Sequence, residues 1–255
     1  MSQIIALTNQ KGGVGKSTSA VNLAASLAGL DRRVLLVDLD PQGHASMGSG
    51  IDKHGLDKSV LDVLLGEATA AETIVRKLPV KYDVLPSNGD LTAAEVELMH
   101  AEQGESGLST ALASVFSQYD VVLIDCPPSL NMLTVNALAA AHGVLIPLQC
   151  EFYALEGLSA LLDTVEQIKQ SINPDLAVSG ILRTMYDKRT SLTREVDKQL
   201  RDYFGDALLK TTIPRNVKVA EAPSHGLPVT QYARFSRGSQ AYRVLAKELI
   251  RRLAL

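Results

Sequence analysis

The segment KGGVGKST, from Lys11 to Thr18, combines the backbone and the side chains that bind a phosphate group. Its glycines let the chain curl so that successive N–H groups point at one anion, and a following helix adds positive potential. Lys16 can neutralise phosphate oxygens, and the Ser17 hydroxyl can ligate Mg²⁺. The usual phosphate loop has a glycine where this chain has Gln10, and Lys11 is an additional lysine. The segment therefore predicts a phosphate-binding loop with an unusual second cation.

Carboxylates stand at the ends of two apolar runs that read as buried strands. Asp38 and Asp40 follow the run 34–37, and Asp125 follows the run 121–124. Ligands of open α/β sheets bind at the carboxyl ends of the strands, so we expect these carboxylates beside the loop. A strand-end aspartate behind a phosphate loop holds Mg²⁺ directly or through water, which is the role we expect for Asp125.

Strands and helices alternate along the chain in a way that brings these groups together. Short apolar runs predict strands at 4–7, 33–38, 82–86, 119–125, 143–148 and 178–182. Helical spacing predicts helices at 17–30, 59–65, 91–101, 107–118, 154–172, 194–204 and 240–253, and residues 43–80 are otherwise expected to form a surface excursion. This alternation indicates an α/β fold with a mostly parallel, twisted β-sheet and helices on both faces. Together with the phosphate loop, it predicts a single P-loop NTPase domain over residues 1–255.

The composition agrees with one α/β domain of 255 residues, of which 46% are hydrophobic. No apolar run approaches the roughly 20 residues that span a bilayer, and the N-terminus has no signal-peptide pattern. We therefore expect a cytoplasmic protein. Cys126 and Cys150 lie in apolar, strand-like contexts and are expected to be core thiols.

The charges are divided unevenly along the chain. From Arg183 to Leu255, 15 Lys and Arg stand against 7 Asp and Glu, a net charge of +8. Residues 1–182 hold the other 10 Lys and Arg and 21 Asp and Glu, a net charge of −11. No Lys or Arg occurs between Lys81 and Lys169. The C-terminal third is therefore a candidate surface for a polyanion, although pairing within the fold can absorb part of this charge.

Five motifs make the chain similar to the ParA/Soj chromosome-partitioning ATPases, within the P-loop group with a deviant Walker A motif that also includes MinD. The resemblance covers essentially the whole chain. The first three motifs define the wider group, and the last two are closer to ParA/Soj than to MinD. The motifs are QKGGVGKST at 10–18, VDLDPQG at 37–43, LIDCPPS at 123–129, QCEFYALEG at 149–157 and IPRNVK at 213–218.

The resemblance implies a catalytic role for three residues. The lysine that matches Lys11 reaches across a two-fold interface to the nucleotide of the partner subunit, so that ATP bridges a homodimer. Lys16 serves the nucleotide of its own subunit. Asp40 matches the carboxylate that positions or activates the attacking water, and Asp125 matches the Walker B aspartate. Positioning and charge neutralisation suffice for slow phosphoryl transfer.

The resemblance also implies ATP and Mg²⁺ as cofactors and a set of residues that hold them. Ser17 and Asp125 are the expected Mg²⁺ ligands, and Pro214 and Asn216 fit the segment that lies against adenine. The full nucleotide-binding set is Lys11, Gly12, Gly13, Val14, Gly15, Lys16, Ser17, Thr18, Glu151, Pro214 and Asn216.

DNA and a ParB-type protein are the partners that the resemblance implies. In this family the ATP-bound dimer binds DNA without sequence preference, and a ParB-type centromere-binding protein stimulates hydrolysis and release. Because the first strand is expected near Gln3, we expect no N-terminal helix-turn-helix module and a non-specific, nucleoid-associated protein. The candidate DNA-binding residues are Lys188, Arg189, Arg215, Lys218 and Arg237.

Two other functions stay open at this point. A MinD-like positioning ATPase would bind a membrane, and the expected helix 240–253 has a stripe of Leu245, Leu249 and Leu253. That helix lacks a Phe or Trp anchor, so docking against the sheet is the favoured interpretation, and we expect no membrane partner. A P-loop metabolic enzyme or reductase component is the second alternative, and two isolated cysteines argue against a cluster-bearing version.

Overall fold

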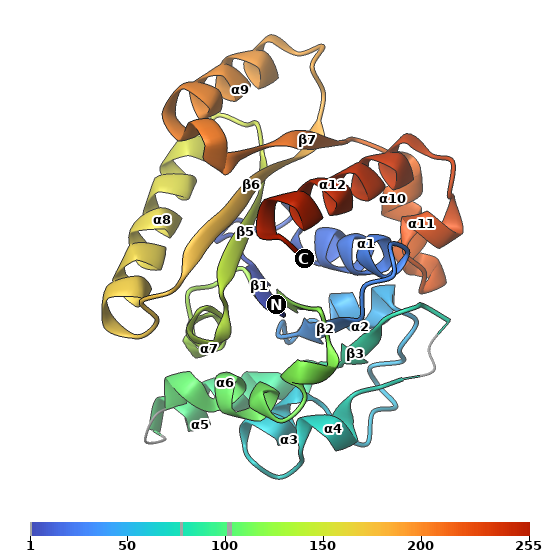
Figure 1. Cartoon of the computed structure of the whole chain (residues 1–255), viewed down its shortest axis with the longest axis vertical. Coiled ribbons are helices and arrows are strands. Elements are labelled where there is room, and N and C mark those ends of the chain that lie inside the picture. Colours follow the sequence, from blue (N-terminus) through green and yellow to red (C-terminus); the bar gives the residue numbers. More distant parts are fainter. Residues whose placement is uncertain (1, 77–78, 101–103) are drawn as a thin grey trace.

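The computed structural model of the chain describes residues 2–76, 79–100 and 104–255. In this part of the chain, a seven-stranded sheet forms the centre, with the strand order β3-β2-β4-β1-β5-β6-β7 (Figure 1). The pairings between neighbouring strands are all parallel, so the predicted α/β fold is confirmed. The strands are β1 Gln3–Leu7, β2 Val34–Asp38, β3 Asp83–Leu85, β4 Val121–Asp125, β5 Gly143–Gln149, β6 Ala177–Tyr186 and β7 Leu208–Pro214.

The central strands are continuously apolar up to the aspartates that end β2 and β4, because helices cover the sheet on both sides. Successive side chains of a strand point to opposite faces. In β1, Ile4 and Ala6 belong to one buried cluster, whereas Ile5 and Leu7 belong to the other. A strand buried on both faces therefore shows no alternation between polar and apolar residues.

Each face of the sheet has its own set of helices (Figure 1). The first set packs on the cluster that includes Ile5, and consists of α1 Lys16–Ala28, α2 His44–Gly48, α10 Val217–Glu221, α11 Val229–Tyr232 and α12 Arg237–Leu253. The second set packs on the cluster that includes Ile4, and consists of α3 Val60–Leu64, α4 Ala70–Thr73, α5 Thr92–His100, α6 Gly107–Ala113, α7 Met132–Ala140, α8 Ala154–Ser171 and α9 Ser191–Phe204.

The spacing of apolar residues predicts neither α7 nor β7. Helix α7 is buried almost all round, at Leu133, Asn136 and Leu138 among others, so it has no polar face to reveal a helical period. Strand β7 is an edge strand with exposed polar positions. Its edge is capped by Glu248 of α12, which accepts hydrogen bonds from the N–H of Lys210 at 2.7 Å and of Thr211 at 2.9 Å.

Other expected elements are found with changed bounds. The helix expected at 107–118 ends at Ala113, and a 3₁₀ turn forms at Phe116–Gln118. The helix expected at 91–101 is α5, and residue 101 lies outside the described residues. The excursion expected at 43–80 contains α2, α3 and α4, and its residues 77–78 also lie outside the description.

Helices long and apolar enough to cross a bilayer do not occur among the described residues. The stripe of α12 is turned inward: Leu245 and Leu249 are fully buried in the cluster that includes Ile5. The expectation that this helix closes the fold against the sheet is confirmed.

Candidate functional site

The phosphate loop lies between the end of β1 and the first turn of α1. Gly15 is the N-cap of α1 and has φ +89°, and Gly13 has φ +77°. Residues that carry a side chain rarely adopt this left-handed backbone conformation. Glycine is therefore favoured at both positions, where the backbone curls. Helix α1 has 13 residues and begins at Lys16, so the positive end of its dipole points into the loop.

Strands β5 and β6 brace the loop from the side. Thr184 Oγ1 donates a hydrogen bond of 2.7 Å to the carbonyl oxygen of Val14, and Gln149 Nε2 donates one of 2.9 Å to that of Gly13. Met185, which follows Thr184 in β6, has φ +47° and lines the cavity beside the loop. No sequence motif predicts this bracing, because the partners are more than a hundred residues apart in the chain.

Lys16 is held beneath the loop, where it is only 7% exposed. Its Nζ lies 3.5 Å from the carbonyl oxygen of Lys11. Burial lowers the pKa of Lys16, while the carboxylates of Asp125 and Asp40 act in the opposite direction. A buried ammonium group needs negative charge close by, and phosphate oxygens in the loop would supply it.

Asp125 is fully buried, and neither of its carboxylate oxygens accepts a hydrogen bond from a described residue. Burial raises its pKa well above the usual range, with the nearby charge of Asp38 acting in the same direction. The Ser17 hydroxyl and Lys16 oppose this rise. A buried carboxylate with free oxygens beside a serine hydroxyl fits a hard divalent cation such as Mg²⁺. Such an ion takes few protein ligands, which agrees with the absence of any three-residue His, Cys, Asp or Glu cluster in the described chain.

Asp38 is equally buried but is satisfied by hydrogen bonds. The backbone N–H and the hydroxyl of Ser46 donate to Asp38 Oδ2 at 2.7 and 2.8 Å. Burial raises the pKa of Asp38 to about 6, and the bonds from Ser46 oppose the rise. These hydrogen bonds tie the end of β2 to Ser46 of α2.

Asp40 is placed by the same segment and lines the cavity beside the loop. Its Oδ1 accepts a hydrogen bond from the N–H of Gln42 at 2.9 Å, and its carbonyl oxygen accepts one from Ser87 Oγ, also at 2.9 Å. The bond from Gln42 holds the carboxylate, and Oδ2 accepts no hydrogen bond from a described residue.

One cavity of about 460 Å³ contains most of the predicted site. Its lining divides into polar groups, which are the loop, Asp40 and Gln42, and apolar side chains such as Met47, Met185 and Leu227. A nucleotide has the same division between phosphates and base. The lining residues are Gly12, Gly13, Gly15, Lys16, Ser17, Thr18, Val21, Asn22, Asp40, Gln42, His44, Met47, Gly48, Pro128, Met185, Pro223 and Leu227.

The residues expected beside adenine do not line this cavity. Pro214 ends β7 opposite Tyr186, and Asn216 caps α10 by accepting a hydrogen bond of 3.3 Å from the N–H of Val219. The apolar wall consists instead of residues such as Met185, Pro223 and Leu227. The sequence carries no motif for this wall.

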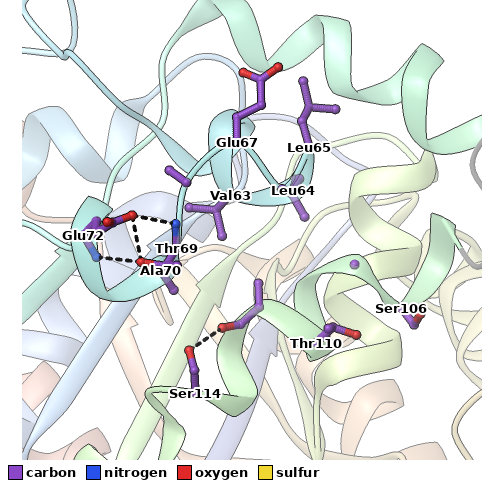
Figure 2. A pocket seen from close by; sticks show the side chains of 14 residues that line it. Val63, Leu64, Leu65, Glu67, Thr69, Ala70, Glu72, Ser106, Thr110 and Ser114 are labelled. Atoms are coloured by element: carbon purple, nitrogen blue, oxygen red, sulfur yellow. Dashed lines mark hydrogen bonds between the residues drawn. The ribbon is translucent and has the colours of Figure 1, made fainter.

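A larger cavity of about 640 Å³ lies elsewhere, between α6 and the segment from α3 to α4 (Figure 2). Its lining includes Glu67 and Glu72 and no Lys or Arg. Glu72 and Thr69 form hydrogen bonds with each other in the capping box at the start of α4 (Figure 2). A cavity without cations does not suit a polyphosphate, so size alone does not identify the nucleotide site.

Lys11 and Glu151 form an ion pair with each other. Their side chains are 49% and 46% exposed, so the pair lies at the surface. Lys11 lines a separate cavity of about 400 Å³ between the loop and the start of α8. Lys11, the additional lysine of the loop, is thus directed away from the phosphate site of its own chain.

The candidate DNA-binding residues differ in how they are engaged. Arg189 forms a bidentate ion pair with Asp187, and this pair lowers the pKa of Asp187 to about 2. Lys218 pairs with Glu221 at 2.8 Å. Lys188 and Arg237 form no salt bridge with any described residue. Arg215 precedes α10 and has an attractive interaction with Asp187.

Comparison with known proteins places this site in a family. A family model described as an AAA domain matches residues 2–178. The sporulation initiation inhibitor protein Soj of Bacillus subtilis (strain 168) is 49% identical over 249 residues, which cover 98% of this chain and 98% of that protein. The chromosome partitioning protein ParA of Caulobacter vibrioides (strain NA1000 / CB15N) is 48% identical, over 98% of this chain and 94% of its own length.

A solved structure shares the fold over the whole length. Cobyrinic acid a,c-diamide synthase from Mycobacterium smegmatis, with bound ADP and magnesium, has a TM-score of 0.88 and 40% sequence identity. The match covers 100% of this chain and 96% of that one. With such relatives along nearly its full length and the loop, Asp40 and Asp125 in place, the chain belongs to the AAA domain family and, within it, to the Soj/ParA group of chromosome-partitioning ATPases.

Proposed function

We propose that this chain is an ATP-driven switch for DNA segregation. ATP and Mg²⁺ bind in the 460 Å³ cavity, two copies associate through the bound nucleotide, and the dimer binds DNA without sequence preference. Hydrolysis, stimulated by a ParB-type partner, then releases the DNA. The observation that carries the proposal is the arrangement of Lys16, Asp40 and the bare carboxylate of Asp125 around one phosphate loop.

The residues of the cavity have separate tasks in nucleotide binding. The loop N–H groups and Lys16 hold the phosphates, and Ser17 would hold Mg²⁺ together with Asp125, which lies behind the lining of the cavity beside Ser17 and Lys16. The bound ion supplies charge neutralisation between the phosphates. The relatives support this assignment, because the Mycobacterium smegmatis structure holds ADP and magnesium on the same fold.

Hydrolysis requires a water molecule positioned against the terminal phosphate. Asp40 is the carboxylate of the cavity wall that can accept a hydrogen bond from that water, since the N–H of Gln42 occupies only its Oδ1. Lys16 offsets charge that develops on the phosphate oxygens. With few groups taking part, a slow intrinsic rate is the expected behaviour, and the switch stays in its ATP state until the partner arrives.

Lys11 is suited to serve a second subunit. An exposed ion pair is worth about 0–1 kcal/mol, so little is lost when Lys11 leaves Glu151. In a face-to-face dimer the two polyphosphates repel each other, and a lysine from each chain reduces that repulsion. Dimerisation would then depend on ATP.

DNA binding by the dimer follows from the charge of the C-terminal third. Residues 183–255 carry the net charge of +8, and two copies double it. Binding to phosphates rises steeply with the number of cations and falls with salt. The dimer is therefore expected to bind DNA much more tightly than the monomer.

A titration of random-sequence duplex DNA with ATP, ADP or no nucleotide, at two salt concentrations, tests the proposal. We expect tight, salt-sensitive binding with ATP only. Equal binding in all three states, or none, would reject the switch. In that case the next function to test is a metabolic one, because the similar structure from Mycobacterium smegmatis is described as a cobyrinic acid a,c-diamide synthase.

A further inference from the structure

Helix α12 exposes a row of cations along one side. Arg243, Lys247 and Arg251 are exposed and stand four residues apart. Four residues advance an α-helix by about 6 Å, so the row is about 12 Å long. Arg237 and Arg252 add an exposed cation near each end of the helix.

The row has no protein partner in the described part of the chain. Arg243, Lys247 and Arg251 make neither a salt bridge nor a side-chain hydrogen bond with any described residue. The single acidic residue of α12, Glu248, is occupied by the N–H groups of Lys210 and Thr211. By contrast, Arg189 and Lys218 are paired with acids. The α12 row thus offers its full charge to a ligand, with no ion pair to break.

The helix presents these cations on a rigid support. Its opposite side is buried at Tyr242, Leu245 and Leu249, where it packs on α1 and β7 (Figure 1). The hydroxyls of Tyr242 and Ser19 lie 3.2 Å apart in this contact. Because most of the apolar side is used inside the fold, the exposed apolar surface of α12 is small, with Val244 as its one exposed large apolar residue.

Helix α12 begins beside α10, which carries one of the other candidate DNA-binding residues. Gly238, in the first turn of α12, packs so closely on α10 that a Cβ there would lie 2.2 Å from the side chain of Val219. Helix α10 carries Lys218, and Arg215 stands just before it. The start of the α12 helix, with Arg237, therefore lies next to the helix that carries Lys218.

We propose that the α12 row, Arg243, Lys247 and Arg251, is a contact surface for the phosphate backbone of DNA. DNA carries about one negative charge per 1.7 Å of axis, so about 12 Å of duplex offers several phosphates to a straight row of cations. Backbone contacts of this kind carry no sequence information. The inference rests on the proposed function and assigns part of its DNA contact to a helix outside the ParA/Soj motifs.

A triple variant, R243Q/K247Q/R251Q, tests the row in the full-length protein. Glutamine keeps the helix propensity of these exposed positions, so the fold should be retained. The matched control is K58Q/K81Q/K169Q, which removes the same charge at exposed positions elsewhere. Fluorescence anisotropy of a random-sequence duplex, with a non-hydrolysable ATP analogue over a range of KCl concentrations, gives affinity and salt dependence. Thermal melting and basal ATP hydrolysis verify that the site is intact.

We expect the α12 variant to bind DNA at least about tenfold more weakly, with a salt slope smaller by about 0.9 for each lost phosphate contact, while the control binds more tightly than the α12 variant. An α12 variant that matches the control in affinity and slope would overturn the inference and leave the proposed function standing. A wild-type chain without ATP-dependent DNA binding would overturn the proposed function. Stronger binding of the wild type to phosphatidylglycerol vesicles than to DNA, lost in the α12 variant, would assign the row to a membrane and also overturn the inference.

Discussion

The carboxyl group of Asp125 is fully buried and accepts no hydrogen bond from a described residue. Its pKa is raised because it is buried. The folded chain therefore holds a proton that the unfolded chain releases, and stability falls as the pH rises above the ordinary range of an aspartate. Asp125 therefore lowers the free energy of unfolding when no ligand is bound, as is common for residues of functional sites.

Asp125→Asn should therefore have opposite effects with and without ligand. Without nucleotide we expect the variant to be more stable than the wild type by about 1–3 kcal/mol at pH 8, and by less at pH 6. The stabilisation that Mg²⁺ and ADP give the wild type should be largely lost in the variant. Thermal melting at the two pH values, with and without Mg²⁺ and ADP, measures both effects. A variant that melts below the wild type at pH 8 without ligand would contradict this account of Asp125.

Asp40→Ala should separate binding from hydrolysis. The phosphate loop and Lys16 remain, so we expect ATP affinity within a few-fold of the wild type, while the single-turnover hydrolysis rate falls about 100-fold or more. Asp40→Asn is the control for folding, because its amide oxygen still accepts the hydrogen bond from the N–H of Gln42. Hydrolysis at the wild-type rate in the alanine variant would show that another group positions the water.

At the scale of elements, one buried arginine joins β6, β7 and α9. Arg183 is fully buried, pairs with Asp197 of α9 and donates to the carbonyl oxygen of Leu209 in β7. The next two residues of β6, Thr184 and Met185, contact the phosphate loop and the cavity. The position of the cavity wall thus depends on an ion pair that no motif contains.

Asp197→Ala should leave the buried guanidinium without its counterion. We expect a loss of about 3–5 kcal/mol in the free energy of unfolding, measured by urea denaturation. Asp202→Ala is the matched control on the same helix, since Asp202 forms an exposed pair with Lys198 at 3.7 Å. The control should change stability by less than about 1 kcal/mol. Equal losses in both variants would show that Asp197 acts only through α9 itself.

The sequence predicts those elements whose burial leaves a regular pattern. The central strands and the phosphate loop follow from continuous apolar runs and from local glycine and lysine spacing, because both signals lie within a few residues. Helix α7 is not predicted because it is buried nearly all round, and strand β7 is not predicted because polar residues such as exposed Lys210 interrupt its apolar pattern at the edge of the sheet.

The site was predictable to the same extent, and for the same reason. The loop, Asp40 and Asp125 stand in short motifs, and all of them meet at one edge of the sheet. Met185 and Leu227 complete the cavity from distant parts of the chain, and the pairing of Lys11 with Glu151 joins residues 140 positions apart. Contacts across such separations depend on the three-dimensional packing and leave no local pattern.

At the scale of the whole molecule, the second lysine of the loop determines the oligomeric state in the proposed function. Lys11→Ala should bind ATP with an affinity close to that of the wild type, since Lys11 does not line the nucleotide cavity of its own chain. With ATP it should remain a monomer by light scattering, whereas the wild type forms a dimer. Lys58→Ala removes an exposed lysine elsewhere and should dimerise normally. A stable ATP dimer of the Lys11 variant would contradict the bridging role.

The cap that Glu248 places on β7 has a consequence for assembly. An uncapped edge strand offers unpaired N–H and C=O groups to the edge of another molecule, which leads to sheet extension and aggregation. Here a carboxylate occupies the N–H groups of Lys210 and Thr211, and exposed Lys210 adds a charge that a second strand would have to bury. Association through the sheet edge is thereby opposed. In the proposed function this matters, because a switch that dimerises through bound ATP requires that two copies do not associate by another route.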